Sequence, residues 1–275
     1  MDSSMRLAVM TSSNVAVFPA GESLALSEFS YELFVWDETG VDTLSGYDII
    51  LIRTCWDYHL KYPSFRDWLD ELAEHRLNVV NPVPSLIWNS HKSYLLDLQE
   101  LGIPVVPTYI GSEVDKLKSD FPGENEFIVK PMISASAFNL RKENRDDLGK
   151  SELDRQCIFQ PFIREIQENG EWSLVFFGHA FSHAVRKKPR PDDFRVQSDL
   201  GGSVEFNDPP ENVLRLARLV VSKLPVRVFY CRIDVVQTTK GCLVMEVEAI
   251  EPELFITGPV AISNYRRFIR GLSKK

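Results

Sequence analysis

Features typical of secreted, disulfide-stabilised and membrane-spanning proteins are largely absent from this sequence. Only four of its 275 residues are cysteine, and none forms a Cys-x-x-Cys pair, so we expect free thiols in a reducing compartment. There is no run of about 18 apolar residues, and the apolar piece near the N-terminus is too short for a signal peptide. These absences predict a cytoplasmic protein with no membrane partner.

Positive charge is also scarce, because 31 Lys and Arg residues face 39 Asp and Glu residues and leave a net charge of −8. Broad nucleic-acid binding relies on neutralising phosphates, so no nucleic-acid partner is expected. A local basic pocket for a nucleotide is still compatible with an acidic protein. With 44% hydrophobic residues, the chain has enough apolar side chains for one large or two moderate folded domains.

The first third of the chain alternates between strand and helix patterns. Short apolar, β-branched or aromatic runs predict strands at Arg6–Met10, Tyr31–Trp36, Tyr47–Ile52 and Leu77–Val80. Between the last two, Pro63–His75 has helical spacing, with its large apolar residues on one face. Strands that alternate with helices predict an α/β unit with a mostly parallel, open sheet.

From about Asn89 onward the pattern contains more paired strands. Helices are expected at Ser93–Leu101, Glu211–Leu224 and Ala261–Leu272. Strands are expected at Phe127–Lys130, Gln156–Ile163, Trp172–Phe177, Ala180–Arg186, Phe229–Gln237 and Cys242–Ile250. The third and fourth of these strands form a hairpin across Gly178-His179, and Gly111–Asn125 is the most loop-like stretch.

The last strand pair carries the most informative side chains. Arg232 and Asp234 share one face of the first strand. Glu246 and Glu248 share one face of the second strand, whereas Met245 belongs to its opposite, apolar face. Neighbouring carboxylates repel one another unless a cation neutralises them, and Mg²⁺ favours such hard oxygen ligands. The alternative is an exposed strand face decorated with charge, which E-x-E alone does not exclude.

Lys130 ends the apolar strand FIVKP, where Pro131 prevents the strand from continuing as a central one. An ammonium group at such a point can enter a ligand cleft and bind phosphate. The alternative for a single lysine is a strand-end side chain whose stem is buried and whose charge reaches solvent.

The order of the motifs is more specific than any one of them. WNSHKSYLLDLQELGIPVVPT is followed by FIVKP, FQPFI, GEWSLVFF, CRIDVV and VMEVEAIEP, an order that resembles the ATP-grasp superfamily over roughly residues 85–275. RTCWDYHLKYPSFRDWL is similar to its D-cycloserine-ligase-like and prokaryotic glutathione-synthetase-like branch. The resemblance implies an ATP-grasp fold of the α/β class, α+β in its nucleotide-binding part. A Rossmann-like pre-ATP-grasp domain would span 1–88 and an ATP-grasp domain 89–275, with a lid near 125–185.

The resemblance also assigns roles to individual residues. The residues that would bind ATP are Lys92, Lys130, Gln160, Phe162 and Glu171, with the backbone of Phe162 on the adenine edge. The ligands of two Mg²⁺ ions, or of Mn²⁺ in their place, would be Asp234, Glu246 and Glu248. The family usually has Asn at the third position, so Glu248 adds negative charge. Arg232 would act near the transferred phosphate, and Arg195 would stabilise an acyl phosphate.

The substrate side is predicted from position. Arg53, Trp56, Asp57 and Tyr58 follow a buried strand, and ligands bind at the carboxyl ends of strands in open sheets. The alternative is that the aromatic residues only pack the domain junction. Arg186 lies at a strand end and is expected to face the cleft, whereas Lys187-Lys188 is expected to be solvated.

The resemblance implies an ATP- and Mg²⁺-dependent ligase that joins a small-molecule carboxylate to an amine through an acyl phosphate. A homodimer is the default assembly for such an enzyme. Two other functions stay open at this point: an ATP-binding module without ligation, and a kinase that stops at phosphoryl transfer.

Overall fold

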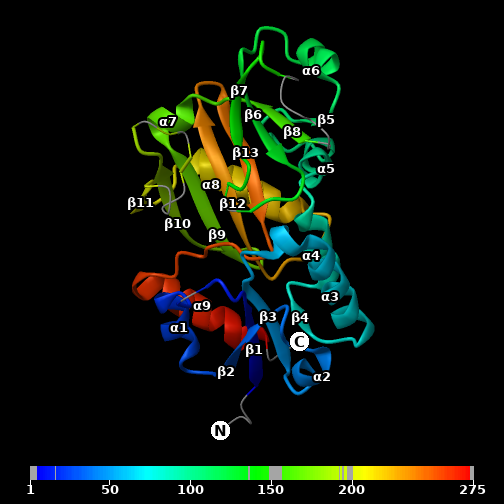
Figure 1. Cartoon of the computed structure of the whole chain (residues 1–275). Helices are drawn as coiled ribbons and strands as arrows, with labels where there is room; N and C mark the ends of the chain where they lie inside the picture. The colour runs from blue at the N-terminus through cyan, green and yellow to red at the C-terminus, as the bar shows by residue number, and fades with distance from the viewer. Residues whose placement is uncertain are drawn as a thin grey trace.

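The computed structural model describes residues 5–15, 17–135, 137–148, 157–191, 193, 195–196 and 201–272. These residues form an N-terminal sheet, a central sheet and a smaller third sheet (Figure 1). No helix within these ranges is both long and apolar enough to cross a membrane.

The N-terminal sheet has the strand order β2-β1-β3-β4, and its strand pairs are parallel. Its strands are β1 (Arg6–Thr11), β2 (Ser30–Val35), β3 (Ile49–Thr54) and β4 (Val79–Val80). The helices around it are α1 (Ala20–Leu26), α2 (Val41–Leu44), the 3₁₀ turn η1 (Tyr58–Lys61) and α3 (Tyr62–Glu74). Every residue of β3 is buried, as expected for a parallel strand covered on both faces, and the predicted parallel sheet is confirmed.

The central sheet is antiparallel and has the order β11-β10-β9-β12-β13. Its strands are β9 (Glu171–Phe177), β10 (Ala180–Lys188), β11 (Ser203–Phe206), β12 (Tyr230–Thr238) and β13 (Gly241–Glu248). The predicted hairpin across Gly178-His179 is confirmed, because Ala180 pairs with Phe177. Gly178 has a φ of 58°, which a two-residue hairpin turn requires. One face of this sheet packs against the amphipathic helix α8 (Glu211–Lys223), and the other face is polar.

The smaller sheet has the order β5-β8-β6-β7 and lies at the upper right of Figure 1. Its strands are β5 (Tyr109–Gly111), β6 (Glu126–Pro131), β7 (Arg141–Asn144) and β8 (Cys157–Pro161); Gln156 of the predicted strand lies outside the described residues. The expected loop at Gly111–Asn125 is wrong, because α6 (Val114–Asp120) forms within it. Leu117 of α6 is fully buried in one core with Phe127 and Phe159, so tertiary packing stabilises a helix whose sequence is mostly polar.

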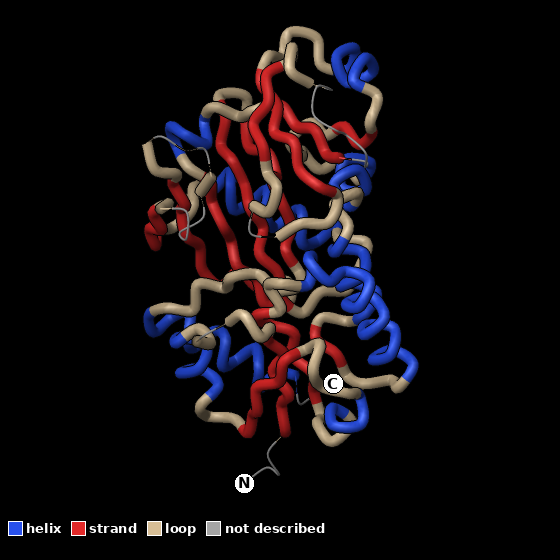
Figure 2. Tube along the Cα trace, in the orientation of Figure 1, coloured by secondary structure: helices blue, strands red, loops and turns tan. Residues whose placement is uncertain are grey.

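Two groups of helices connect the sheets. The C-terminal helix α9 (Gly258–Leu272) lies beside α1 in Figures 1 and 2, and its Tyr265 shares a core with Leu7 of β1 and Tyr230 of β12. On the other side, α3, α4 (Val83–Ser90) and α5 (Tyr94–Glu100) follow one another along the molecule. The predicted domain boundary at residue 88 falls within α4, and the division into two domains stays a prediction.

Candidate active site

A cleft of about 420 Å³ lies between the polar face of the central sheet and the smaller sheet. One wall comes from β9, β10, β12 and β13, and the opposite wall comes from β6 and β8. The sequence-predicted site residues that line it are Trp56, Tyr58, Lys92, Lys130, Gln160, Phe162, Glu171, Arg195, Arg232, Asp234, Glu246 and Glu248. Three predicted residues do not line it, namely Arg53, Asp57 and Arg186.

Two buried lysines face the same part of this cleft. The ammonium group of Lys92 is paired with Glu246; burial alone would lower the pKa of Lys92, but Glu246 reverses this effect and the pKa is raised. Lys130 is only 7% exposed, and no described side chain is paired with it. Burial lowers the pKa of Lys130 to about 8, with Glu246 opposing and Lys92 adding to the effect. The alternative of a solvated charge is therefore wrong for Lys130, and an anionic ligand would stabilise it.

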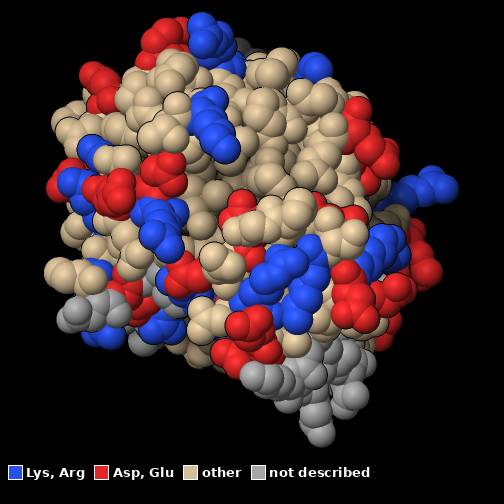
Figure 3. Space-filling model, turned by 90° about the horizontal axis from the view of Figure 1, so that it is seen from above, with Lys and Arg blue, Asp and Glu red and all other residues tan. Residues whose placement is uncertain are grey.

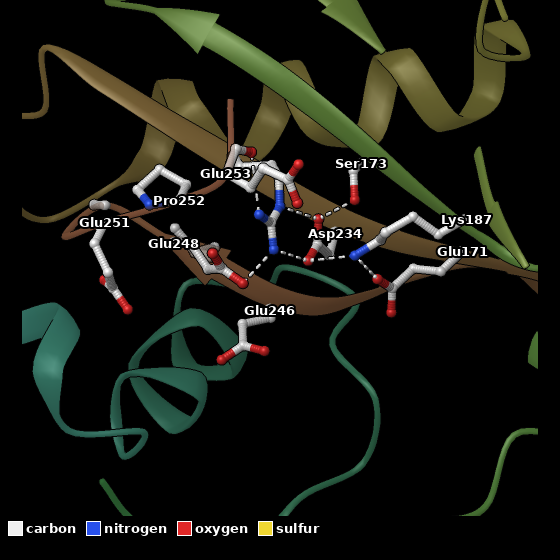
Figure 4. A network of polar contacts seen from close by, with 12 residues as sticks. Glu171, Ser173, Lys187, Asp234, Glu246, Glu248, Glu251, Pro252 and Glu253 are labelled. Carbon is white, nitrogen blue, oxygen red and sulfur yellow. Dashed lines mark hydrogen bonds and ion pairs between the residues drawn. The ribbon is translucent and has the colours of Figure 1, made fainter. Parts of the chain in front are cut away.

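Two cross-strand pairs on β12 and β13 bring three carboxylates and the guanidinium of Arg232 together; we call the carboxylates Asp234, Glu246 and Glu248, which Figure 4 labels, the acidic row. Asp234 lies opposite Glu246, and Arg232 lies opposite Glu248. Arg232 donates to both oxygens of Asp234 at 2.9 Å and also contacts Glu248, while Ser173 of β9 donates to Asp234 at 2.6 Å. Burial would raise the pKa of Asp234, but Arg232, Lys187 and the Ser173 hydroxyl together hold this pKa below its usual range. The alternative of an exposed, charge-decorated strand is wrong, because Arg232 and Asp234 are both buried.

A β-bulge in β13 changes which apolar side chain faces the cleft beside these carboxylates. The register shifts between Asp234/Glu246 and Val235/Val244, so Met245 is the extra residue. Met245 consequently lines the cleft beside Glu246, and the expectation that it lies on the opposite face is wrong. Val244 and Val247 occupy that opposite face and are fully or almost fully buried.

A second bulge decides which cation of β10 enters the cleft. A regular hairpin across Gly178-His179 would pair Glu171 with Arg186. The register shifts between Phe181 and His183, so Glu171 pairs with Lys187 instead. Lys187 is 6% exposed and lies 2.6 Å from Glu171 and 3.3 Å from Asp234.

The expectations for both cations were therefore wrong. Arg186 points to the other face of β10, where it donates to the carbonyl of Asn169 at 2.5 Å and does not line the cleft. Lys187 is a buried cleft residue rather than a solvated one, whereas Lys188 is half-buried and pairs with Glu205 at 3.7 Å. The sequence alone does not show which of Arg186, Lys187 and Lys188 faces the cleft, because this depends on the bulge in β10.

The chemistry of the acidic row fits Mg²⁺, which takes hard oxygen ligands from carboxylates. Asp234 and Glu246 are direct cross-strand neighbours and can reach a shared ion. In this conformation, however, Arg232, Lys187 and Lys92 are already paired with the three carboxylates. Within the part of the chain that the structure describes, no three His, Cys, Asp or Glu side chains are grouped so that they could hold a metal. To bind here, Mg²⁺ would have to displace the ammonium and guanidinium groups that pair with these carboxylates.

The other end of the cleft suits a flat, apolar ring. Its apolar lining consists of Val106, Ile163, Ile166 of α7 (Glu165–Asn169), Val196 and Met245. Gln160 is buried there and donates to the Thr108 hydroxyl at 3.0 Å. The N–H of Phe162 donates to the carbonyl of Glu126 at 2.9 Å, so this N–H is already bonded within the protein, and the contact of the Phe162 backbone with adenine stays a prediction. Glu171 lines the same cleft, and burial raises its pKa against the opposing charge of Lys187.

Arg53 is buried in the fold instead of facing the cleft. Its guanidinium binds both oxygens of Glu22 on α1, at 2.7 and 2.9 Å, and donates to the carbonyl of Pro252 at 2.8 Å. It is 1% exposed, so a substrate could not reach it without opening this core. The predicted direct substrate contact is therefore wrong, and Arg53 is better described as an anchor for the chain at Pro252.

Asp57 also has a structural partner set, since it accepts from Trp36 Nε1 at 2.8 Å and pairs with Lys61 at 2.9 Å. Trp56, which lies between Arg53 and Asp57 in the sequence, does line the cleft, and its Nε1 donates to the Glu251 carbonyl at 3.0 Å. Of Arg53, Trp56 and Asp57, only Trp56 lines the cleft, and its contact with a substrate stays a prediction.

Arg195 lies at the rim of the cleft, where its side chain is 34% exposed and pairs with Asp193 at 2.8 Å. Glu251, in the turn Glu251-Pro252-Glu253 after β13, is not among the predicted site residues, yet its side chain lines the cleft and is buried. Burial raises its pKa to about 8, and the negative charge of Glu248 adds to this.

The positive charge of the site lies on buried side chains. On the face shown in Figure 3, basic and acidic side chains are interspersed. Lys92, Lys130, Lys187 and Arg232 are all buried, so their charge acts inside the cleft. This arrangement reconciles a net charge of −8 with a local site for an anion.

Comparison with known proteins assigns the two parts of the chain. Residues 18–81 match the N-terminal domain of D-cycloserine synthetase DcsG, and residues 97–256 match the RimK-like ATP-grasp domain. The chain is 27% identical over 256 residues to the cycloserine biosynthesis protein DcsG of Streptomyces lavendulae, covering 82% of this chain and 83% of the relative. It is 22% identical over 236 residues to a glutathione synthetase of Yersinia pestis, covering 80% and 73%.

The crystal structure of D-cycloserine synthetase DcsG has the same fold, with a TM-score of 0.81 at 23% identity over 98% of this chain and 99% of that one. The ATP-grasp fold and branch predicted from the motif order are confirmed, as is the enzyme class, an ATP-dependent ligase that forms a C–N bond. ATP-grasp ligases use ATP together with Mg²⁺. Since the matched domain spans more than half of its length, this chain belongs to the RimK-like ATP-grasp family.

Proposed function

We propose that this protein joins the carboxylate of a small, amino-acid-like substrate to an amine, using ATP and Mg²⁺ and passing through an acyl phosphate. The observation that carries the proposal is the acidic row of β12 and β13, in which Asp234 is buried and Glu246 and Glu248 are half-buried, and which faces Lys92 and Lys130 in one cleft. A cleft of about 420 Å³ is large enough for a nucleotide-sized ligand. The names of two relatives, a D-cycloserine synthetase and a glutathione synthetase, favour a small substrate of amino-acid type.

The chemistry solves a leaving-group problem. A carboxylate reacts poorly with an amine because oxide would have to leave. In the proposed first step, a carboxylate oxygen attacks the γ-phosphorus of ATP, the bond to the bridging oxygen breaks, and ADP leaves. In the second step, the amine attacks the acyl carbon, inorganic phosphate leaves, and the amine nitrogen loses a proton to give the amide.

The residues of the cleft support this reaction mainly by holding positive charge in place. Lys92, Lys130 and Arg232 are buried, so their charges act in a medium of low polarity, where they stabilise transferring phosphate more strongly than in water. Asp234, Glu246 and Glu248 would hold Mg²⁺, which supplies further positive charge to the phosphates when bound. The pairing of Lys92 and Arg232 with these carboxylates keeps both signs of charge ordered before ATP arrives.

The apolar end of the cleft is proposed to take the adenine ring, with Glu171 near the ribose. Arg195, at the rim, is proposed to meet the acyl phosphate. Its exposure of 34% lets it approach a substrate that enters from solvent. The smaller sheet is proposed to act as a lid, since an acyl phosphate must be protected from water.

The test is a screen for products. The full chain is incubated with MgATP and pairs drawn from a panel of amino acids and small amines, and ADP release and product mass are measured. An amide product supports the ligase, whereas a stable phosphorylated product identifies a kinase. ATP binding without turnover across the panel identifies a binding module. Neither turnover nor ATP binding would contradict the whole assignment.

A further inference from the structure

One buried carboxylate in the cleft has no ion-pair partner among the residues that the structure describes, and the nearby charge of Lys92 does not outweigh its burial. Glu251 is 9% exposed and lines the cleft, yet no described side chain donates a hydrogen bond to its carboxylate or forms an ion pair with it. Its own backbone N–H is the donor that it meets. In Figure 4 this carboxylate points away from the Arg232 network, in contrast to Glu248. Burial makes the ionised form of Glu251 unfavourable, which raises its pKa, and a ligand that supplies positive charge would stabilise that ionised form.

Side-chain hydrogen bonds fix the backbone on both sides of Glu251. Six consecutive carbonyls, from Ala249 to Leu254, each accept a hydrogen bond from a side chain; we call this stretch the anchored segment. From the Ala249 carbonyl to the Leu254 carbonyl, the donors are, one for each residue in turn, Asn81 at 2.7 Å, Tyr230 at 2.8 Å, Trp56 at 3.0 Å, Arg53 at 2.8 Å, Arg232 at 3.2 Å and His183 at 2.7 Å. These bonds fix the direction of the Glu251 side chain, so its exposure to the cleft is built into the fold.

The groups beside Glu251 fit a small organic cation. Trp56 and Phe255 line the same cleft and offer aromatic rings, which attract cations. Tyr58 also lines it, and its hydroxyl has no hydrogen-bond partner among the described residues. Phe255 has a φ of 49°, a strained value for a residue with a side chain, and such strain is concentrated at ligand sites. Glu251 lies three positions after Glu248, next to the proposed phosphoryl-transfer site.

We propose that Glu251 binds the primary ammonium group of the substrate and so selects ammonium-bearing molecules over neutral analogues of the same shape. This inference rests on the proposed ligase function, because it places the cation beside the activated carboxylate. Arg53 and Trp56 serve as positioning residues, since they hold the carbonyls of Pro252 and Glu251. The contact deepens the proposed function by defining the substrate as an amino acid or a related primary amine.

The experiment compares matched probes that differ only in charge. Alanine, serine and β-alanine supply the ammonium group, and lactate, glycerate and 3-hydroxypropionate replace it with a hydroxyl group; chiral probes are used as both enantiomers. Each is titrated calorimetrically into the full chain, with and without MgADP. A hydrogen-bonded charge pair predicts that at least one ammonium probe binds the wild type about 10–100-fold more tightly than its hydroxy analogue.

Three variants assign this preference to the carboxylate. Glu251→Gln keeps the shape and is expected to reduce the preference to about twofold, while Glu251→Asp keeps the charge and should retain part of it. Glu100→Gln removes an exposed carboxylate from α5 and should change nothing. MgADP affinity should be the same in all four proteins.

The outcomes separate this inference from the proposed function. The inference is overturned if the wild type shows no preference for ammonium probes, or if Glu251→Gln keeps the full preference. Loss of MgADP binding in the wild type would instead contradict the proposed function. Binding of MgADP together with an unchanged preference in Glu251→Gln would leave the ligase standing and remove Glu251 from substrate recognition.

Discussion

Replacing Lys130 with methionine should stabilise the ligand-free protein while removing its affinity for ATP. Burial lowers the pKa of Lys130 from its ordinary value of 10.5 to about 8, with Lys92 adding to this and Glu246 partly opposing. The difference of about 2.5 between these values corresponds to about 3 kcal/mol of unfavourable free energy at neutral pH. Methionine has a similar length and no charge, so Lys130→Met should recover about 1–3 kcal/mol. The melting temperature should then rise by about 2–4 °C per kcal/mol.

The pH dependence follows from the sign of this shift. Between pH 8 and 10.5 the unfolded chain binds a proton at Lys130 that the folded chain does not, so the wild type gains stability as pH rises. The penalty is fully present below pH 8. The stability difference between Lys130→Met and the wild type should therefore be largest near pH 7 and shrink towards pH 10.5.

The assay is urea unfolding of both proteins at pH 7 and pH 10, together with calorimetric titration of MgATP. Lys188→Met is the matched control, because Lys188 lies half-buried outside the cleft and its loss should change neither quantity appreciably. The reasoning is refuted if Lys130→Met is no more stable than the wild type at pH 7, or if it binds MgATP as tightly as the wild type.

Three further predictions follow from the site and its supports. Glu246→Gln should abolish Mg²⁺-dependent turnover without altering the circular dichroism spectrum; unchanged activity would remove Glu246 from the metal site. Lys187→Met should lower kcat by about 100-fold, whereas Arg186→Met should leave kcat within about threefold, and steady-state kinetics that reverse this order would contradict the bulge in β10. Arg53→Met leaves the buried Glu22 without its partner and should reduce the free energy of unfolding by about 3–5 kcal/mol. Arg66→Met breaks only an exposed pair with Asp70 and should cost less than about 1 kcal/mol, as measured by urea unfolding.

The main elements of the fold could be predicted because hydrophobic periodicity and turn residues are local signals. β3 is apolar before Arg53, and α8 has one continuous apolar face, so both were found close to their observed bounds. α6 could not be found in this way, because its sequence is mostly polar and its one buried side chain, Leu117, is stabilised by packing against Phe127 of β6 and Phe159 of β8. Tertiary packing decided that segment, and its own pattern did not.

The site could be predicted where the side-chain alternation is regular. Arg232 and Asp234, and likewise Glu246 and Glu248, face the cleft as two-residue spacing requires. Prediction failed where a bulge breaks the alternation, since one extra residue reverses the faces of all residues beyond it. Met245 and the Arg186/Lys187 pair were misplaced for this reason.

A second kind of error concerns charged residues near strand ends. Arg53 follows a buried strand and looks like a ligand-binding residue, but its partners, Glu22 and the Pro252 carbonyl, come from opposite ends of the chain. Glu251 is the opposite case, because it lies in the cleft but was not predicted there. Nothing in the Glu251-Pro252-Glu253 turn indicates that six side chains bind the carbonyls of this segment. Both assignments depend on contacts between residues far apart in the sequence, which only the folded chain reveals.

The central claim is that the substrate carboxylate is activated by direct phosphoryl transfer from ATP. The most direct measurement uses a carboxylate substrate labelled with oxygen-18 and follows the inorganic phosphate released during turnover by mass spectrometry. An acyl phosphate intermediate predicts that one labelled oxygen passes from the carboxylate to phosphate for each amide formed. Unlabelled phosphate in the presence of amide product would contradict the proposed mechanism.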